Sequence, residues 1–340
     1  MNGQVMAAEM ADQPRVLERL LARREVVAAD VQAVLPDQLA GITLVARGSS
    51  DNAALYGRYL FEITSHRPAG LAAPSIHTLY LTPVDYTGYL AIGISQSGQT
   101  PEIVTVLRRM REQGARTVAV VNSAASELAD AADVTIELGA GTELAVPATK
   151  TFTATLLGLA LVAHALGEVP WVEADLASLP DQMAALLDDP GCADIVAADF
   201  DGSDRVVVSG RGLLLVAALE TALKIRETSG IFGEGISPAD LRHGPIAAVG
   251  EGFPVLSFAS DHAGAADAAD LETILRQRGA RVHTIAPTAD ASCRLPEHVP
   301  DALLPLLAVI RGQQIAAAIA RRRHLDPDAP ASLTKVTLTH

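Results

Sequence analysis

Two segments in the first half of the chain have hydroxyl and amide groups that could bind an anion. Each follows an apolar run typical of a buried strand, at 42–46 (ITLVA) and 89–95 (YLAIGIS). In open α/β sheets, ligands bind outside the carboxyl ends of the strands, where such segments lie. The candidate binding residues are Gly48, Ser49, Ser50, Ser95, Gln96, Ser97 and Thr100.

The second segment also predicts a helix start. Thr100 is a favourable N-cap and Pro101 suits the first helical position, so a helix is expected over 101–113. Free N–H groups and the positive dipole end there favour a phosphate. The alternative is a polar turn that only caps a helix, but two such segments in one half favour the anion site. Neither GxGxxG nor GxxxxGK[ST] follows a strand, so the sequence indicates neither a dinucleotide site nor a P-loop.

A second group of residues could move protons. Lys224 and Glu227 are three apart, on one face of a predicted helix, and His243 stands beside Gly244 and Pro245, which break the chain. A carboxylate and an imidazole are the usual pair for proton transfer near neutral pH. Taken alone, Lys224 and Glu227 could equally be a solvated ion pair, and His243 a surface histidine.

The elements that must position these residues alternate between strand and helix. Helical periodicity extends to about Leu35, and a crossover rich in Pro, Asp and Glu spans 167–181. The sequence predicts an α/β fold of two tandem doubly wound domains with parallel sheets. The expected parts are 1–35 (helical), 36–170, 185–322 and an extended tail, 323–340. The expected strands are 42–46, 89–95, 117–122, 134–138, 205–210, 253–259 and 281–287, and the expected later helices are 151–166 and 265–278.

Composition narrows the function further. The 340 residues are 49% apolar, which excludes intrinsic disorder, and carry a formal net charge of −14. So acidic a chain is not expected to bind nucleic acid or an anionic membrane through a broad basic surface. Cys192 and Cys293 form no CxxC pair, so neither a zinc cluster nor a disulfide framework is expected. Glu9 and Asp12 interrupt any signal-peptide core, and a cytoplasmic protein is expected.

Four motifs together resemble one family. GSSDNA, ISQSGQTPE, GTELAVPATKTFTA and ADLRHGP, in this order, resemble the sugar-isomerase (SIS) superfamily over about residues 40–340. More narrowly, they resemble the isomerase half of glutamine–fructose-6-phosphate amidotransferases, and the closing DPDAPASLTKVTLT resembles stand-alone type II glucosamine-6-phosphate deaminases. The resemblance implies two flavodoxin-like, three-layer domains, a homodimer, a phosphosugar substrate and no metal or organic cofactor.

The resemblance also implies roles for single residues. Ser50, Ser95, Gln96, Ser97 and Thr100 would hold the phosphate and nearby hydroxyls, and Val146 and Ala148 would line the sugar. Glu227 would be the isomerisation base with Lys224 beside it, His243 would open the sugar ring from the partner subunit, and Lys335 would match a Schiff-base lysine. Ala148 departs from the serine usual in the synthases, so one hydroxyl contact is not expected. Position 2 is Asn2 where the synthases have a nucleophilic cysteine, so transfer of ammonia from glutamine is not expected.

These inferences predict a glucosamine-6-phosphate deaminase that forms fructose 6-phosphate and ammonia. The alternatives within the same chemistry are another amino-sugar phosphate, such as a galactosamine or fructose-amine phosphate, and a synthase-like isomerase without a glutaminase. A different class would be a phosphosugar-sensing SIS module, but such regulators carry a helix-turn-helix domain, for which residues 1–40 are too short.

Overall fold

The computed structural model describes residues 3–331 and 333–335, in two compact units. Among the described residues, unit 1 comprises 3–14, 144–149 and 171–335, and unit 2 comprises 15–143 and 150–170. Each unit contains one five-stranded parallel sheet with helices on both faces, so the predicted fold class is confirmed. The four domain boundaries drawn from the sequence stay a prediction, and residues 332 and 336–340 of the predicted tail lie outside the described residues.

The sheet of unit 2 has the strand order β2-β1-β3-β4-β5. Its strands are β1 (Gly41–Val45), β2 (Ala69–Leu71), β3 (Tyr89–Ser95), β4 (Arg116–Val121) and β5 (Val134–Glu137). All five residues of β1 are buried, as expected for a parallel strand covered on both faces. The sequence did not predict the three-residue edge strand β2.

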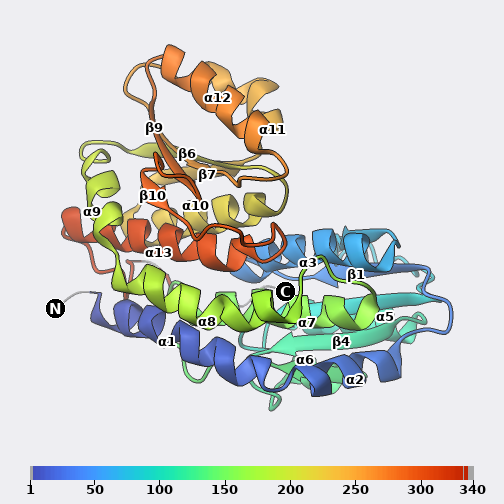
Figure 1. Cartoon of the computed structure of the whole chain (residues 1–340). Coiled ribbons are helices and arrows are strands. Elements are labelled where there is room, and N and C mark those ends of the chain that lie inside the picture. Colours follow the sequence, from blue (N-terminus) through green and yellow to red (C-terminus); the bar gives the residue numbers. More distant parts are fainter. Residues whose placement is uncertain (1–2, 332, 336–340) are drawn as a thin grey trace. The chain divides into compact units, whose positions relative to one another are not determined.

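Helices cover both faces of this sheet (Figure 1). Side chains of α5 and α6 pack on the face that carries Val45 and Ala91. On the opposite face α3 and α7 pack so closely that Gly57 and Gly158 have no space for a Cβ beside Leu44 and Leu138. The helices contributing to this part of the chain are α1 (Gln4–Leu21), α2 (Arg24–Val34), α3 (Ser49–Ser65), α4 (Pro74–Thr78), α5 (Pro101–Glu112), α6 (Glu127–Ala131) and α7 (Lys150–Leu166).

The sheet of unit 1 repeats the same topology, with the order β10-β9-β8-β6-β7. Its strands are β6 (Arg205–Gly210), β7 (Phe232–Ile236), β8 (Pro254–Phe258), β9 (Arg281–Ala286) and β10 (Cys293–Arg294). Numbered within the unit, this is again 2-1-3-4-5, read from the other edge. The sequence predicted β6, β8 and β9 but neither of the edge strands, β7 and β10.

The helices of unit 1 also lie on both faces of their sheet, with α11 and α12 on one side and α10 and α13 on the other (Figure 1). They are α8 (Glu173–Asp188), α9 (Gly191–Ala198), α10 (Leu215–Ser229), α11 (Pro238–Arg242), α12 (Ala265–Gln277) and α13 (Leu304–Arg322), with short 3-10 turns at Gly212–Leu214 and Pro245–Ala248.

The crossover predicted at 167–181 is wrong over most of its length, because α8 begins at Glu173. Apolar side chains at Leu176, Leu179, Met183 and Leu186 recur at helical spacing and are buried. This periodicity prevails over the Pro and Asp content that suggested a loop. Pro180 is accommodated inside the helix.

The expectation of no disulfide is also wrong. Cys192 in α9 and Cys293 in β10 form a disulfide, with their Cα atoms 5.3 Å apart. This spacing lies within the normal range for a disulfide. The two cysteines are 101 positions apart in the sequence, and only the packing of unit 1 brings them together.

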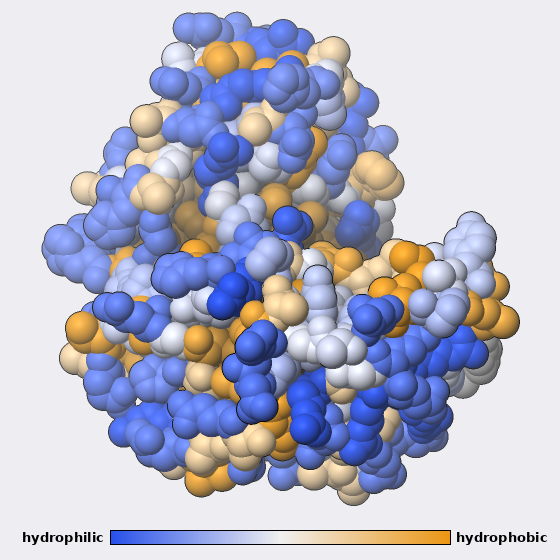
Figure 2. Space-filling view, turned by 90° about the vertical axis from the view of Figure 1, so that its right-hand side faces the viewer, coloured by the Kyte–Doolittle hydropathy of each residue, from blue (hydrophilic) through white to orange (hydrophobic). Residues whose placement is uncertain are grey.

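Two further features are the polarity of the described surface and the length and polarity of the described helices. Hydrophilic residues predominate on the face drawn in Figure 2, and apolar residues are scattered among them. No helix in the described ranges is both long and apolar enough to cross a membrane.

Candidate active site

The two Ser-rich segments lie together in unit 2 because of the order of its strands. In the order 2-1-3-4-5 the direction of chain progress reverses between β1 and β3, which pair in parallel. The turn at Gly48 follows β1 and the turn after Ser95 follows β3, so both lie at the carboxyl edge of neighbouring strands. This reversal point is where doubly wound sheets bind ligands. Helices α3 and α5 start directly from these turns, at Ser49 and Pro101.

The turn after β3 is held in shape by its own hydroxyl groups. Ser95 Oγ, which is buried, lies 3.2 Å from Thr100 Oγ1 and also accepts the N–H of Gly98 at 3.2 Å. Ser97 Oγ accepts the N–H of Gln99 at 3.2 Å. Helix α5 begins at Pro101 as predicted, and Thr100 occupies its N-cap position. However, the Thr100 hydroxyl does not cap the helix, because it pairs with Ser95 instead.

An ion pair that the sequence did not predict joins the two turns. Arg47, between β1 and Gly48, donates from Nε and Nη2 to the two carboxylate oxygens of Glu102, at 2.9 and 3.0 Å. Glu102 is buried in the first turn of α5. The planar two-bond geometry fixes direction as well as distance. Arg47 therefore fastens the turn after β1 to the start of the helix after β3.

Unit 1 repeats this ion pair at its own reversal point, but without serines in the turn after β6. Arg211 follows β6 as Arg47 follows β1, and its Nε lies 3.4 Å from Oδ2 of Asp267 in the first turn of α12. Gly212 has φ +59°, matching the φ of +61° at the glycine after Arg47. Leu213 and Leu214 stand where unit 2 has Ser49 and Ser50. The hydroxyl donors suited to a phosphate are therefore present after β1 and absent after β6.

Three charged side chains form a row on α10 in unit 1, and two of them, Glu220 and Lys224, are buried. Lys224 Nζ lies 2.5 Å from Glu227 Oε2 and 3.3 Å from Glu220 Oε1. Lys224 and Glu220 are each 1% exposed, whereas the side chain of Glu227 is 22% exposed. The alternative of a solvated ion pair is therefore wrong. Sequence reasoning missed Glu220, although its i, i+4 spacing to Lys224 was a readable signal.

The charges of this row determine its chemistry. Burial by itself would lower the pKa of Lys224, but the nearby carboxylates of Glu220 and Glu227 outweigh it and raise that pKa. Lys224 is thus a cation at neutral pH. One positive and two negative charges leave the row with a net negative charge. Glu220 is enclosed, so the carboxylate accessible to a substrate is that of Glu227.

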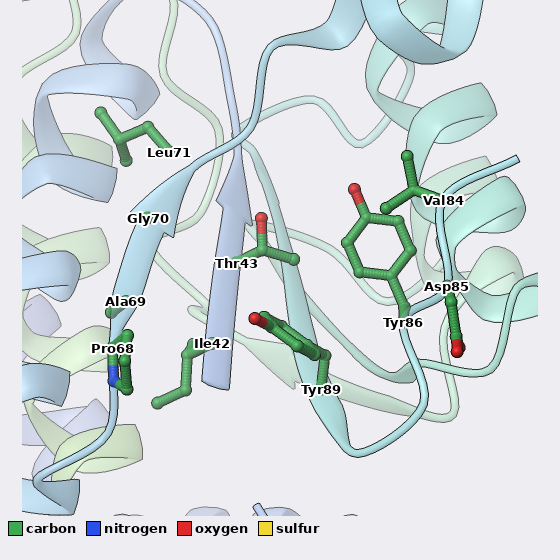
Figure 3. A pocket seen from close by; sticks show the side chains of 10 residues that line it. All are labelled: Ile42, Thr43, Pro68, Ala69, Gly70, Leu71, Val84, Asp85, Tyr86 and Tyr89. Atoms are coloured by element: carbon green, nitrogen blue, oxygen red, sulfur yellow. The ribbon is translucent and has the colours of Figure 1, made fainter. Parts of the chain in front are cut away.

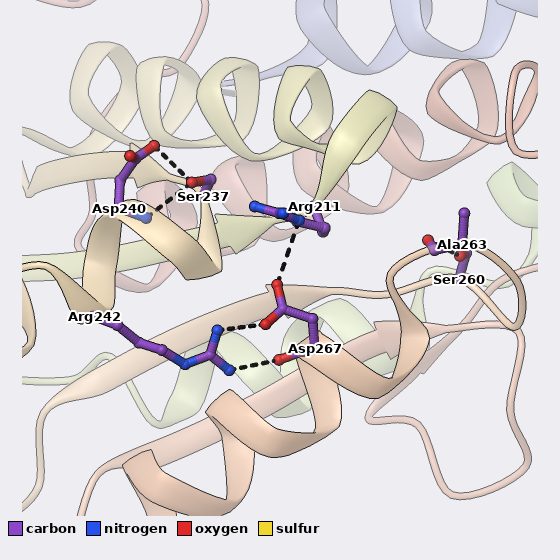
Figure 4. A network of polar contacts seen from close by, with 7 residues as sticks. All are labelled: Arg211, Ser237, Asp240, Arg242, Ser260, Ala263 and Asp267. Atoms are coloured by element: carbon purple, nitrogen blue, oxygen red, sulfur yellow. Dashed lines mark hydrogen bonds and ion pairs between the residues drawn. The ribbon is translucent and has the colours of Figure 1, made fainter.

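His243 lies at the C-terminal end of α11, in agreement with the chain break predicted from Gly244 and Pro245, and it is exposed. Ser237 caps the start of this helix by accepting a backbone N–H at 3.1 Å. Arg242 anchors its end by donating from Nη1 to the carboxylate of Asp267 and from Nη2 to the Asp267 carbonyl, the latter at 2.9 Å. Figure 4 shows Arg211 and Arg242 converging on this one carboxylate. The position of His243 is therefore fixed from both ends of α11.

The remaining predicted residues are also in unit 1. Val146 and Ala148 are half-buried in the loop 144–149, and Lys335 is half-buried at the end of the described tail. The structure thus groups the Ser-rich turns in unit 2 and pairs Lys224 with Glu227 in unit 1. The roles assigned to all these residues stay predictions. In the described ranges no group of three or more His, Cys, Asp or Glu could hold a metal ion.

A concavity of about 330 Å³ in unit 2 is separate from these residues. Figure 3 shows Tyr86 and Tyr89 beside it, with Ile42 and Thr43 near the start of β1. It therefore lies toward the amino ends of the strands, away from the carboxyl ends that carry the Ser-rich turns. None of the predicted site residues lines it.

Fold and site together define a chain of two doubly wound α/β domains, one of which has a hydroxyl-lined reversal point. The chain belongs to the SIS domain family, whose model matches residues 40–165 and 200–294. Two curated relatives are named glutamine–fructose-6-phosphate aminotransferase [isomerizing]. The one from Methanothermobacter thermautotrophicus is 32% identical over 341 residues, and the one from Mycobacterium tuberculosis 32% over 358. The alignments cover 97% of this chain but only 56% and 57% of those relatives.

Solved structures agree on the fold along nearly the whole chain. A candidate phosphosugar isomerase from Silicibacter pomeroyi is 32% identical with a TM-score of 0.86, covering 96% of this chain and 100% of that one. A glucosamine-6-phosphate deaminase from Thermotoga maritima is 22% identical with a TM-score of 0.82, covering 99% of this chain and 100% of that one.

Proposed function

We propose that this protein is a phosphosugar isomerase that deaminates glucosamine 6-phosphate to fructose 6-phosphate and ammonia. The observation that carries the proposal is the row on α10. In it a fully buried lysine, neutralised by a buried glutamate, leaves one accessible carboxylate, that of Glu227. Such a carboxylate suits abstraction of a proton from the carbon next to a carbonyl.

The Ser-rich turns of unit 2 would bind the phosphate. Two helices start from them, and the hydroxyl groups of Ser49, Ser50, Ser97 and Thr100 are half-buried rather than enclosed. Backbone N–H groups at helix starts bind phosphate without a lysine. Such local donors suit a chain with a net charge of −14.

The proposed reaction begins when His243 helps to open the pyranose ring. Glu227 then removes the C2 proton of the open-chain aldehyde, and the electron pair moves to form an enolamine. Return of a proton to C1 gives a ketimine at C2. Water adds to the ketimine and ammonia leaves, so glucosamine 6-phosphate and water become fructose 6-phosphate and ammonia. The Lys224 cation would orient the carboxylate of Glu227 throughout.

Two further roles belong to the same proposal. His243 acts from the partner subunit of a homodimer, in line with its exposed position at the end of α11. Lys335 contacts the ketose end of the substrate. The motif that contains it, DPDAPASLTKVTLT, resembles the tail of the stand-alone deaminases.

The comparisons support this chemistry at different levels. The relative from Silicibacter pomeroyi is described as a phosphosugar isomerase candidate and matches over its whole length. This chain spans little more than half of the curated aminotransferases, whose complete reaction is therefore no guide to its own. The deaminase from Thermotoga maritima has the same fold over its full length, which makes deamination compatible with this architecture.

The test is to incubate the purified protein with glucosamine 6-phosphate and to measure ammonia and fructose 6-phosphate. Glu227→Gln should lower kcat by about 10²- to 10⁴-fold, the usual contribution of a positioned general base. Glu234→Gln is the matched control, because Glu234 is an exposed glutamate of the same unit. Absence of product, or an unimpaired Glu227→Gln variant, contradicts the proposal.

A substrate panel separates deamination from related reactions. Galactosamine 6-phosphate and a fructose-amine phosphate test the choice of sugar, and fructose 6-phosphate with glutamine or ammonia tests the synthetic direction. Deuterium uptake from heavy water into C1 or C2 of the sugar reports proton transfer, whichever direction is favoured. Turnover of another sugar without glucosamine 6-phosphate turnover contradicts the proposed substrate and retains the isomerase.

A further inference from the structure

One carboxylate in the C-terminal segment caps the first helix of the described chain. Asp328 accepts the backbone N–H groups of Gly3 and Val5 at Oδ2, both at 3.1 Å, and that of Met6 at Oδ1, at 2.8 Å. These donors belong to the start of α1, where N–H groups have no partner within the helix. A negative charge at this end is also favoured by the helix dipole. Asp328 thus satisfies three backbone donors about 320 positions away in the sequence.

The same residue holds the loop that contains Val146. The carbonyl of Asp328 accepts the Val146 N–H at 2.9 Å. The two preceding residues of the loop, Leu144 and Ala145, donate their N–H groups to the carboxylate of Glu9 on α1, the second at 3.3 Å. Three successive N–H groups of the loop are therefore bound either by α1 or by the residue that caps α1.

The adjoining residues restrict the position of Asp328. Pro327 is buried, and its Cγ is so close to Gly3 that a Cβ there would approach it to 3.0 Å. Asp326 Oδ1 accepts the N–H of Asp328 at 3.0 Å and that of Gly3 at 3.3 Å. Asp328 therefore cannot move relative to α1 without breaking these contacts.

We propose that Asp328 is a positioning residue. By fastening the loop 144–149 to the start of α1, it fixes the positions of Val146 and Ala148 in this loop. The part played by Val146 and Ala148 in sugar binding rests on the proposed function. The fastening itself rests on the hydrogen bonds of Asp328 and Glu9 and can be tested without a substrate. Asp328 touches neither substrate nor reacting atoms in this assignment, so its effect is on binding geometry.

Hydrogen–deuterium exchange of the whole protein tests the fastening. Asp328→Ala should accelerate exchange in peptides covering 3–10 and, together with them, 144–148, by about five- to tenfold, as expected for loss of a cap that stabilises both. Asp328→Asn keeps one acceptor oxygen and should show a smaller change in the same two segments. It serves if the alanine variant does not fold. Asp188→Asn, at an exposed aspartate of the same unit, is the matched control.

The exchange experiment and the kinetics of the variants each give a result that would overturn the proposal. Faster exchange confined to 3–10, with 144–148 unchanged, reduces Asp328 to a helix cap and overturns it. With an active enzyme, Asp328→Asn should raise KM for the phosphosugar about fivefold with little change in kcat, since loss of positioning affects ground-state binding. A fivefold fall in kcat with KM unchanged also overturns the proposal. If no phosphosugar is turned over by the wild type, the proposed function fails, and the exchange result still decides the fastening.

Discussion

Replacing Lys224 with methionine tests whether the row on α10 is a buried charge network. Methionine has a similar length and is apolar, so the change removes the cation with little change in volume. Glu220 is 1% exposed and would then lack the cation 3.3 Å away, whereas the side chain of Glu227 is 22% exposed and stays in contact with water. At an effective dielectric constant of about 20, two charges at this distance attract by about 5 kcal/mol before desolvation is counted.

The cost of protonating Glu220 at each pH gives a better estimate of the destabilisation by Lys224→Met. In the variant, Glu220 either stays a buried anion without the Lys224 cation or takes up a proton. For a carboxyl with an ordinary pKa of about 4.3, taking up a proton costs about 3.7 kcal/mol at pH 7 but only about 1 kcal/mol at pH 5. Each value is an upper limit on the destabilisation at its pH, and the value at pH 7 agrees with the ~3–5 kcal/mol usually lost when one member of a buried pair is removed. We therefore expect the destabilisation at pH 7 to exceed that at pH 5 by up to about 2.7 kcal/mol.

Urea unfolding of the whole protein, followed by circular dichroism at pH 5 and pH 7, measures this difference. The double variant Lys224→Met, Glu220→Gln removes both enclosed charges and should recover much of the stability lost at pH 7. The wild type supplies an alkaline check. Since the pKa of Lys224 is raised above its ordinary 10.5, the stability it contributes is present below pH 10.5 and is lost only as the pH rises through the higher folded value. A destabilisation relative to the wild type that is equal at both pH values, or a variant as stable as the wild type at pH 7, would refute the reasoning.

Further predictions concern the Ser-rich turns. Glu102→Gln removes the negative charge from the two-bond pair with Arg47. We expect KM for the phosphosugar and Ki for inorganic phosphate to rise about three- to tenfold at similar kcat. Unchanged constants for both ligands would contradict the positioning of the turns by this pair. Gly98→Ala should abolish phosphate competition, because φ is +62° and a Cβ would lie 2.3 Å from Ser126 Oγ. Its control, Gly139→Ala, has a similar φ of +60° with open space around the new Cβ, so binding and calorimetry should show only a loss of about 1 kcal/mol in stability. Equal effects of the two alanine variants would show that backbone strain, and not the contact with Ser126, controls the turn.

Much of the site could be predicted from the sequence because its signals are local. The Thr-Pro pair placed the start of α5 at Pro101, since capping preference and the fixed φ of proline act within a few residues. The spacing of Lys224 and Glu227 placed both on one helix face for the same reason. Alternation of apolar runs with helical periodicity was sufficient to predict parallel sheets.

What the tertiary structure decided depends on contacts between distant parts of the chain. The adjacency of the turns after β1 and β3 follows from strand pairing, which local patterns do not specify. The burial of Glu220, which turns an ordinary i, i+4 ion pair into an enclosed counter-charge, follows from the packing around α10. The bond between Cys192 and Cys293 and the cap that Asp328 forms on α1 join residues more than 100 positions apart. The sequence by itself determined which chemical groups this protein has and which local elements hold them. Long-range packing decided which of these groups meet, because the free energy of burial and pairing depends on neighbours that only the folded chain supplies.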